Sequence, residues 1–180
     1  MNTNLGSRLL IGVLFSYTAL AQTTDEYQVK AAFIYNFAKF VEWPPETFKT
    51  DKDPIRICVL GHDPFGHSLA DAVSGKTVLG RPFVLTSLSD PSEARECQIL
   101  FVSSSERKHL RSILGELRTM TVLTVGETEG FATQGGIVNF KLIDGRVRLE
   151  INIEAAWQAK LRISSQVLSL ASIVKDGVQK

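Results

Sequence analysis

Apolar runs rich in branched side chains alternate with amphipathic segments along the middle of the chain. The clearest run, Ile55–Leu60, is almost wholly apolar and stops at Gly61, which is typical of a strand covered on both faces. Asp63 and Pro64 follow and favour a helix start, because a carboxylate can cap free N–H groups and proline suits the first turn. This strand–loop–helix unit predicts the opening of an α/β domain.

The alternation continues towards the C-terminus. Strands are predicted at residues 79–88, 98–102 and 121–125, and helices at residues 65–73 and 103–117. Pro82 favours an edge position for the first of these strands. Ser103, followed three residues later by Glu106, predicts a capping box at the second helix. Because strand and helix alternate, we expect parallel pairing with right-handed crossovers.

A different pattern begins after a glycine-rich stretch, residues 130–136. Two strand-like runs, residues 137–143 and 146–151, flank Asp144-Gly145, which is a strong signal for a two-residue hairpin turn. Asn152 is expected to cap a helix through residue 160, and Ser164 to cap a second one. The apolar stripe of that last helix would be Val167, Leu170, Ala171 and Val174.

A long helical pattern at residues 27–41 precedes the first strand and ends at the sequence Trp43-Pro44-Pro45. At about 100° per residue its apolar positions cover a wide arc, which needs more than one sheet face to bury it. Either a second helix or a partner protein covers the arc, and an ordinary core helix is the alternative interpretation. The candidates for partner contact are Tyr27, Phe33, Phe37, Phe40 and Trp43.

The first 21 residues predict a secretory signal peptide. Arg8 precedes an apolar run that is short for a membrane span, and Ala19-Leu20-Ala21 matches a cleavage site after Ala21. An uncleaved N-terminal anchor is the alternative. Because no later stretch approaches a membrane span, we expect an exported chain that is not embedded in the membrane.

Length and charge fit a single exported domain. Removal of 21 of the 180 residues leaves 159, enough for one domain with a real core at residues 22–180. The 20 basic and 19 acidic side chains give a net charge of +1, which indicates neither nucleic acid nor an anionic membrane as partner. The predicted fold is α/β, a three-layer sandwich. It has a mixed, mostly parallel sheet of about six strands, a C-terminal antiparallel hairpin, and helices on both faces.

The chain has two cysteines, Cys58 in the first strand and Cys97 just before the strand at residues 98–102. In an exported protein such a pair can form a disulfide, and two separate buried thiols are the alternative. A metal pair is disfavoured because no other ligand cluster accompanies the cysteines. We therefore expect neither a metal nor a cofactor.

Loops at strand ends hold the remaining candidates for chemistry. His62, Asp63, Ser103, Gly135 and Gly136 could line a crevice that binds a small ligand, or could serve only as turn and cap residues. The chain has no nucleophile elbow of the form G-x-S-x-G and no phosphate-binding loop. We predict no catalytic residue. The residues suggest a binding module whose crevice could accept a small ligand or a protein, and a hydrolytic domain that uses the strand-end loops is the alternative.

The sequence resembles the YfiR family of periplasmic proteins over residues 27–174. The most specific block is residues 27–44, which reads YQVKAAFIYNFAKFVEWP. Further matching blocks follow in the same order at residues 61–66, 99–103, 122–125, 130–132, 135–140, 151–152 and 163–168.

This resemblance implies an α/β fold that tends to form homodimers. It also implies a non-enzymatic periplasmic repressor that binds the periplasmic part of an inner-membrane diguanylate cyclase, or another sensor such as a histidine kinase, and lowers cyclic di-GMP output. Cys58 and Cys97 would be the family's structural disulfide. Some members have a second cysteine pair near the glycine-rich loop, but residues 132–140 contain none here, so redox control through a second bridge is not expected.

Overall fold

The computed structural model describes residues 17–177, with side chains from Glu26 onward. The predicted signal peptide, residues 1–21, lies outside the described residues apart from the backbone of residues 17–21, which begins the first helix. The signal peptide therefore stays a prediction.

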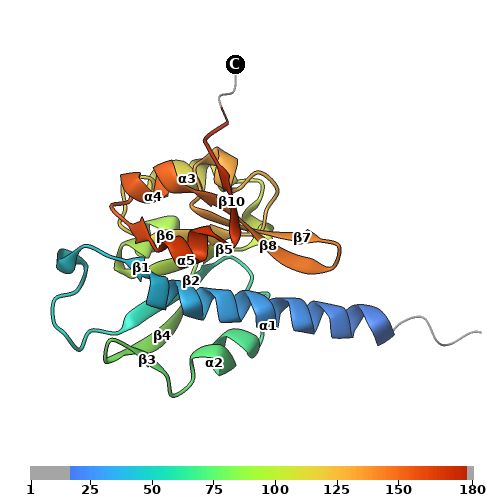
Figure 1. The fold of residues 1–180 in the computed structure, drawn as a ribbon, viewed down its shortest axis with the longest axis horizontal. Helices are drawn as coiled ribbons and strands as arrows, with labels where there is room; N and C mark the ends of the chain where they lie inside the picture. Colours follow the sequence, from blue (N-terminus) through green and yellow to red (C-terminus); the bar gives the residue numbers. More distant parts are fainter. Residues whose placement is uncertain (1–16, 178–180) are drawn as a thin grey trace, which may run out of the picture.

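An eight-stranded sheet forms the centre of the fold, in the order β10-β8-β7-β6-β5-β2-β4-β3 (Figure 1). Its strands are β2 Ile55–Leu60, β3 Thr77–Val78, β4 Arg81–Leu88, β5 Ile99–Val102, β6 Leu123–Gly126, β7 Val138–Ile143, β8 Arg146–Asn152 and β10 Ala171–Val174. The β3–β4 and β7–β8 pairs are antiparallel and the other neighbours are parallel. A separate two-stranded sheet pairs β1 Val41–Glu42 with β9 Arg162–Ile163.

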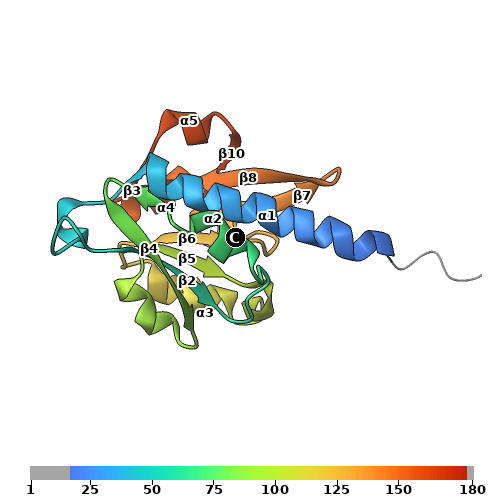
Figure 2. The same ribbon diagram turned by 90° about the horizontal axis from the view of Figure 1, so that it is seen from below.

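Helices cover both faces of the large sheet, as predicted. They are α1 Tyr17–Phe40, α2 Ser68–Val73, α3 Leu110–Leu117, α4 Ile153–Gln158 and α5 Ser165–Leu168. Short 3-10 turns are η1 Pro45–Thr47, η2 Pro91–Glu96, η3 Ser104–Glu106 and η4 Ala132–Gln134. Figure 2 shows α1 and α5 on one side of the sheet and α3 on the other. The α/β class is confirmed, with more strands than the six expected.

Two hydrophobic cores lie on the two faces of the sheet. Ile57 and Phe101 point into the core under α1, whereas Leu60 and Leu100 point into the core under α3. Adjacent residues of one strand thus enter different cores, because side chains alternate across a strand. This explains why β2 is apolar without a polar face.

Two helices begin later than predicted, for reasons visible in their caps. Asp63 Oδ1 accepts from the Phe65 N–H at 2.8 Å, which makes a local turn, and α2 starts only at Ser68. Ser103 Oγ caps the short turn η3, and α3 starts at Leu110. The capping box does not form there, since the Ser103 N–H donates to the Leu60 carbonyl at 3.0 Å.

The last predicted helix is wrong in its second half. Ser164 caps α5 as expected, but α5 ends at Leu168, and Ala171–Val174 is strand β10. Every residue of β10 pairs in parallel with β8. The open edge of β8 offers backbone hydrogen bonds, and the branched Ile173 and Val174 suit a strand.

None of the helices in the described part of the chain combines the length and hydropathy that crossing a bilayer requires.

Candidate functional site

The aromatic residues proposed for partner contact lie at different depths along α1. Phe37 is only 1% exposed and packs against Phe140 with a ring separation of 6.2 Å, so it is a core residue. Phe33 and Phe40 are half-buried and flank Phe37 on the same side of the helix. The structure therefore brings these three phenylalanines together at one surface, where Phe37 forms the floor.

That surface is a groove between α1 and the C-terminal segment, of about 180 Å³. Residues of α1 form one wall, and residues of β8 and the C-terminal segment form the other. The lining is Phe33, Asn36, Phe37, Phe40, Leu149, Gln166, Val167 and Leu170. We call it the α1 groove. Leu170 is 65% exposed on its rim, and most of the lining is apolar. Exposed apolar surface next to a concave site is typical of a contact surface for another protein.

Tyr27 lies elsewhere, in a polar cluster near the start of the described side chains. Its hydroxyl donates to the Glu127 carboxylate at 3.1 Å, and Lys30 Nζ approaches the same carboxylate at 2.7 Å. Lys30 also pairs with Glu26 and is only 4% exposed. This cluster joins α1 to the segment after β6.

Burial, together with the charge and hydrogen bonding of the Glu127 carboxylate, raises the pKa of Tyr27. Tyr27 therefore stays a neutral hydrogen-bond donor throughout the physiological pH range. Its role in the structure is to anchor α1, beside Phe65, whose ring it meets edge-on at 5.5 Å.

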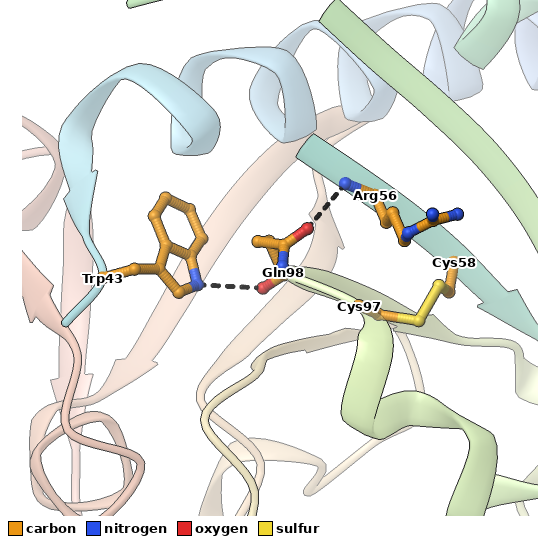
Figure 3. The surroundings of a disulfide bond; sticks show 5 residues. All are labelled: Trp43, Arg56, Cys58, Cys97 and Gln98. Atoms are coloured by element: carbon orange, nitrogen blue, oxygen red, sulfur yellow. Dashed lines mark hydrogen bonds between the residues drawn. A yellow bond between two sulfur atoms is a disulfide. The ribbon is translucent and has the colours of Figure 1, made fainter. Parts of the chain in front are cut away.

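Trp43 is also fixed in place, by Gln98, which lies between it and the disulfide (Figure 3). Its indole Nε1 donates to the carbonyl oxygen of Gln98 at 3.2 Å, and the Gln98 side chain accepts from the Arg56 N–H at 2.7 Å. The expected disulfide between Cys58 and Cys97 is present, with the two Cα atoms 6.0 Å apart. It joins β2 to the end of η2, so Trp43, Gln98 and the bridge form one structural corner.

The loops after β2 and β5, which hold the crevice candidates His62 and Ser103, contact each other. The His62 N–H donates to Ser105 Oγ at 3.1 Å, while the side chains of His62 and Asp63 are exposed. A Cβ at Gly61, whose φ is +87°, would collide with Ser105 and Glu106. Ser103 is buried and serves as a cap. These residues lie together, but they close the space between the loops.

Gly135 and Gly136 lie in the loop before β7, whose first paired residue, Val138, is level with Val125 near the carboxyl end of β6. Gly135 lines a small cavity with Leu117 and Ala155, whereas His62 and Ser103 lie in the loops after β2 and β5. A side chain at Gly136 would collide with the ring of Phe131, which explains the glycine by close packing. The five loop candidates therefore do not form one site.

A second, more open groove of about 460 Å³ lies between α1 and α2. Its lining is Tyr27, Gln28, Pro64, Phe65, Gly66, His67, Ser68 and Asp71. Within residues 26–177, no three His, Cys, Asp or Glu side chains gather in a way that could hold a metal ion.

Two important features escaped the sequence reasoning. The apolar spacing predicts a helix stripe that includes Leu170, whereas Leu170 lies in the turn between α5 and β10 and lines the α1 groove. The buried pair of Lys30 and Glu127 was also missed, although a lysine between Val29 and Ala31, inside the apolar arc, was a visible signal for a buried partner.

One comparison with known proteins shows the family, and another shows the fold. The family model described as YfiR/HmsC-like matches residues 27–172. Comparison with curated proteins gave no significant match.

Two solved structures share the fold. One is a conserved domain protein from Vibrio cholerae O1 biovar El Tor, with a TM-score of 0.50 and 13% identity, covering 67% of this chain and 54% of that chain. The other is the ABC domain in complex with L-Trp from Streptococcus pneumonia, with a TM-score of 0.50 and 9% identity, covering 85% and 60%. The chain thus spans 54% and 60% of the lengths of these structures, and at such identities the likeness concerns the fold alone. Because the family model covers most of its length, the chain belongs to the YfiR/HmsC-like family.

Proposed function

We propose that this protein is a periplasmic regulator that binds and represses the periplasmic sensor part of an inner-membrane diguanylate cyclase, or of a similar signalling receptor, and so lowers cyclic di-GMP signalling. Family membership over residues 27–172 is the observation that carries the proposal. The family is a regulatory rather than a catalytic one, and the proposed role needs no bond-making chemistry.

The α1 groove is the surface that best suits such a role. A groove of about 180 Å³ can accept one or two apolar side chains of a partner, which is the way in which protein interfaces concentrate their binding energy. Asn36 and Gln166 lie among its apolar lining and could fix the orientation of the partner. Phe33 and Phe40 are the two earlier partner-contact candidates with accessible surface in this groove.

Binding in the groove represses a sensor only when it favours the inactive arrangement of that sensor. A ligand shifts a conformational equilibrium by its difference in affinity for the two states. The partner should therefore present its apolar segment to the groove in the inactive state and withhold it in the active state.

The experiment compares two exposed leucines. Leu170→Glu places a charge on the rim of the groove, while Leu142→Glu makes the same change on β7, where Leu142 is 51% exposed. We expect Leu170→Glu to weaken binding to the purified periplasmic sensor domain by about tenfold or more, because it buries an unpaired charge. In cells it should raise cyclic di-GMP towards the level of a deletion strain. Leu142→Glu should leave both quantities near their native values.

Two results would distinguish a wrong contact surface from a wrong function. Equal binding by the native protein and Leu170→Glu would exclude the α1 groove as the contact surface. Absence of binding to any periplasmic sensor domain, with cyclic di-GMP unchanged on deletion, would exclude the function itself.

A further inference from the structure

A polar pocket of about 270 Å³ lies at the amino end of β2, next to Gln98 of the structural corner. The connector between η1 and β2 forms one wall, and the end of η2 forms another. Its charged and hydroxyl-bearing lining residues are Thr47, Lys49, Asp53, Arg56, Arg95 and Glu96. We call it the β2 pocket. A lining of this kind selects a polar ligand, whereas the α1 groove is mostly apolar.

The three basic side chains of the β2 pocket have no partner among residues 26–177. Lys49 Nζ and the guanidinium groups of Arg56 and Arg95 make no ion pair and no hydrogen bond with any residue of the described chain. Arg56 is half-buried, and its guanidinium has N–H donors but no acceptor. Withdrawing such a group from water without an acceptor costs free energy, which an anion in the pocket would offset.

The carboxylate of Asp53 does not fill that role, because its oxygens are engaged within its own turn. Asp53 Oδ2 accepts from the Lys49 N–H at 2.7 Å and from the Thr50 N–H at 3.2 Å, and Asp53 Oδ1 accepts from Thr50 Oγ1 at 2.6 Å. Arg81 donates to the carbonyl oxygens of Thr50 and Asp53 at 2.7 and 3.0 Å and lies over the Phe48 ring. The connector wall is thus held in place before any ligand binds, as in most small-molecule sites.

The structural corner fixes the backbone at the two arginines (Figure 3). The Arg56 N–H donates to Gln98 Oε1 at 2.7 Å, and the Gln98 N–H donates to the Arg56 carbonyl oxygen at 3.0 Å. Gln98 is only 6% exposed and also accepts from the Trp43 indole. The disulfide holds Cys97, which lies two residues after Arg95. Donors that are positioned in advance need less ordering when a ligand binds.

We infer that the β2 pocket binds a small anion, and that Arg56, Arg95 and Lys49 hold a carboxylate or phosphate group of this anion. Arginine presents parallel N–H donors that match two oxygens of either group, and lysine adds a compact positive charge. Three basic side chains against the two acidic ones, Asp53 and Glu96, leave an excess of one positive charge in the lining.

Thr47 is a second observation that points to a ligand. Its Oγ1 is buried and has no hydrogen-bond partner in the described part of the chain. Buried hydroxyl groups are rarely left in this state. A rotation of the Thr47 side chain would let it donate to an oxygen of the bound anion. The pocket is also close to the lower size limit of small-molecule sites, roughly 300 Å³, so its ligand has few atoms.

The β2 pocket is separate from the proposed regulatory surface. It shares no lining residue with the α1 groove, so an anion and a protein partner can be bound at the same time. The inference therefore stands whether or not the α1 groove binds a sensor.

The test is calorimetric titration of the purified protein with inorganic phosphate and, separately, with succinate, at an ionic strength kept constant with chloride. We expect saturable binding of one anion per chain with a Kd of about 1 mM or tighter. Saturation by phosphate alone would identify a phosphate site, and saturation by succinate alone would identify a carboxylate site. Saturation by both would show that the pocket recognises the charge and the oxygens that the two groups share.

Substitutions of opposite sign locate the binding. Arg56→Gln and Arg95→Gln should each weaken binding by about tenfold or more, because each removes charge-assisted hydrogen bonds. Glu96→Gln should tighten binding by about threefold, because it removes a negative charge from the lining. Arg148→Gln, at an exposed position of β8, is the matched control and should leave the Kd unchanged.

Three results would overturn the inference. The first is that neither anion saturates the native protein at about 10 mM, tenfold above the expected Kd. The second is equal weakening by Arg148→Gln and Arg56→Gln, which would indicate attraction by the overall charge. The third is weaker binding by Glu96→Gln. Circular dichroism shows whether each variant is folded, and Arg95 is exposed, so Arg95→Gln keeps the test valid if Arg56→Gln unfolds.

Discussion

Leu79 is the residue whose backbone conformation agrees least with its side chain. Both central residues of the β3–β4 turn, Leu79 and Gly80, have positive φ, as a type I′ hairpin turn requires. Asparagine adopts this conformation far more readily than leucine.

Leu79→Asn should therefore raise the free energy of unfolding by about 1 kcal/mol. Urea denaturation of Leu79→Asn beside the native protein measures the effect. Gly80→Ala, at the neighbouring position with a φ of +78°, is the control and should lower stability. A loss of stability in Leu79→Asn would show that leucine makes a contact within one chain that outweighs the strain.

Tyr27 gives the protein a pH dependence on the alkaline side. Its pKa is raised in the folded state, so its contribution to stability is complete below the unfolded value of about 10 and is lost as the pH rises above it. The free energy of unfolding of the native protein should fall more steeply above pH 10 than that of Tyr27→Phe. Parallel slopes in urea titrations between pH 9 and pH 11 would contradict the role assigned to the Glu127 hydrogen bond.

At the scale of elements, α1 is held to the sheet by packing and by one buried ionic cluster. Lys30 lies between the carboxylates of Glu26 and Glu127, and all three side chains are largely withdrawn from water. Removing one partner of such a group leaves an uncompensated buried charge.

Lys30→Met should lower the free energy of unfolding by about 3–5 kcal/mol, and adding Glu127→Gln should restore a large part of it. A double-mutant cycle from urea denaturation gives both quantities. Lys39→Met, on the exposed side of the same helix, should cost no more than about 1 kcal/mol. Equal effects of the two lysine changes would mean that the cluster is not what fixes α1.

How far elements can be predicted depends on whether their signal is local. The run Ile55–Leu60 and the Asp144-Gly145 turn carry their own patterns, so β2 and the β7–β8 hairpin were predictable. Strand β10 has apolar residues at helical spacing, so the local pattern predicts a helix there. It is a strand because it pairs with β8, which the local pattern cannot show.

The same limit applies to the site. The phenylalanines of α1 could be recognised from their spacing, whereas the groove also needs Leu149 of β8 and Leu170 of the turn between α5 and β10. Phe37 is buried because it packs against Phe140 of β7, and a helical wheel of α1 alone cannot show this contact. The loops after β2 and β5 contact each other through the hydrogen bond from the His62 N–H to Ser105 Oγ. The two residues are distant in sequence, so the local pattern does not predict this contact.

At the scale of the whole molecule, one sheet separates two hydrophobic cores, and the disulfide lies in the core under α3. Cys58 and Cys97 both belong to that core and are 39 residues apart in sequence. In the chain-entropy model, a closed loop of this length stabilises the folded state by about 4 kcal/mol.

The double variant Cys58→Ser/Cys97→Ser should therefore lose up to about 4 kcal/mol of the free energy of unfolding. Chemical denaturation with and without reductant measures it. Reductant should lower the stability of the native protein and leave the double variant unchanged. If reductant lowered both equally, the loss would have a cause other than this bridge.

Because of this disulfide, the stability of a newly synthesised chain depends on the compartment that it reaches. The cytosol keeps thiols reduced, so a polypeptide retained there would lack this restraint, unfold more often, and be degraded faster. A copy translocated into an oxidising space would be locked after arrival and would persist. Accumulation of the protein would then report successful secretion, and molecules retained in the cytosol would be removed by proteolysis.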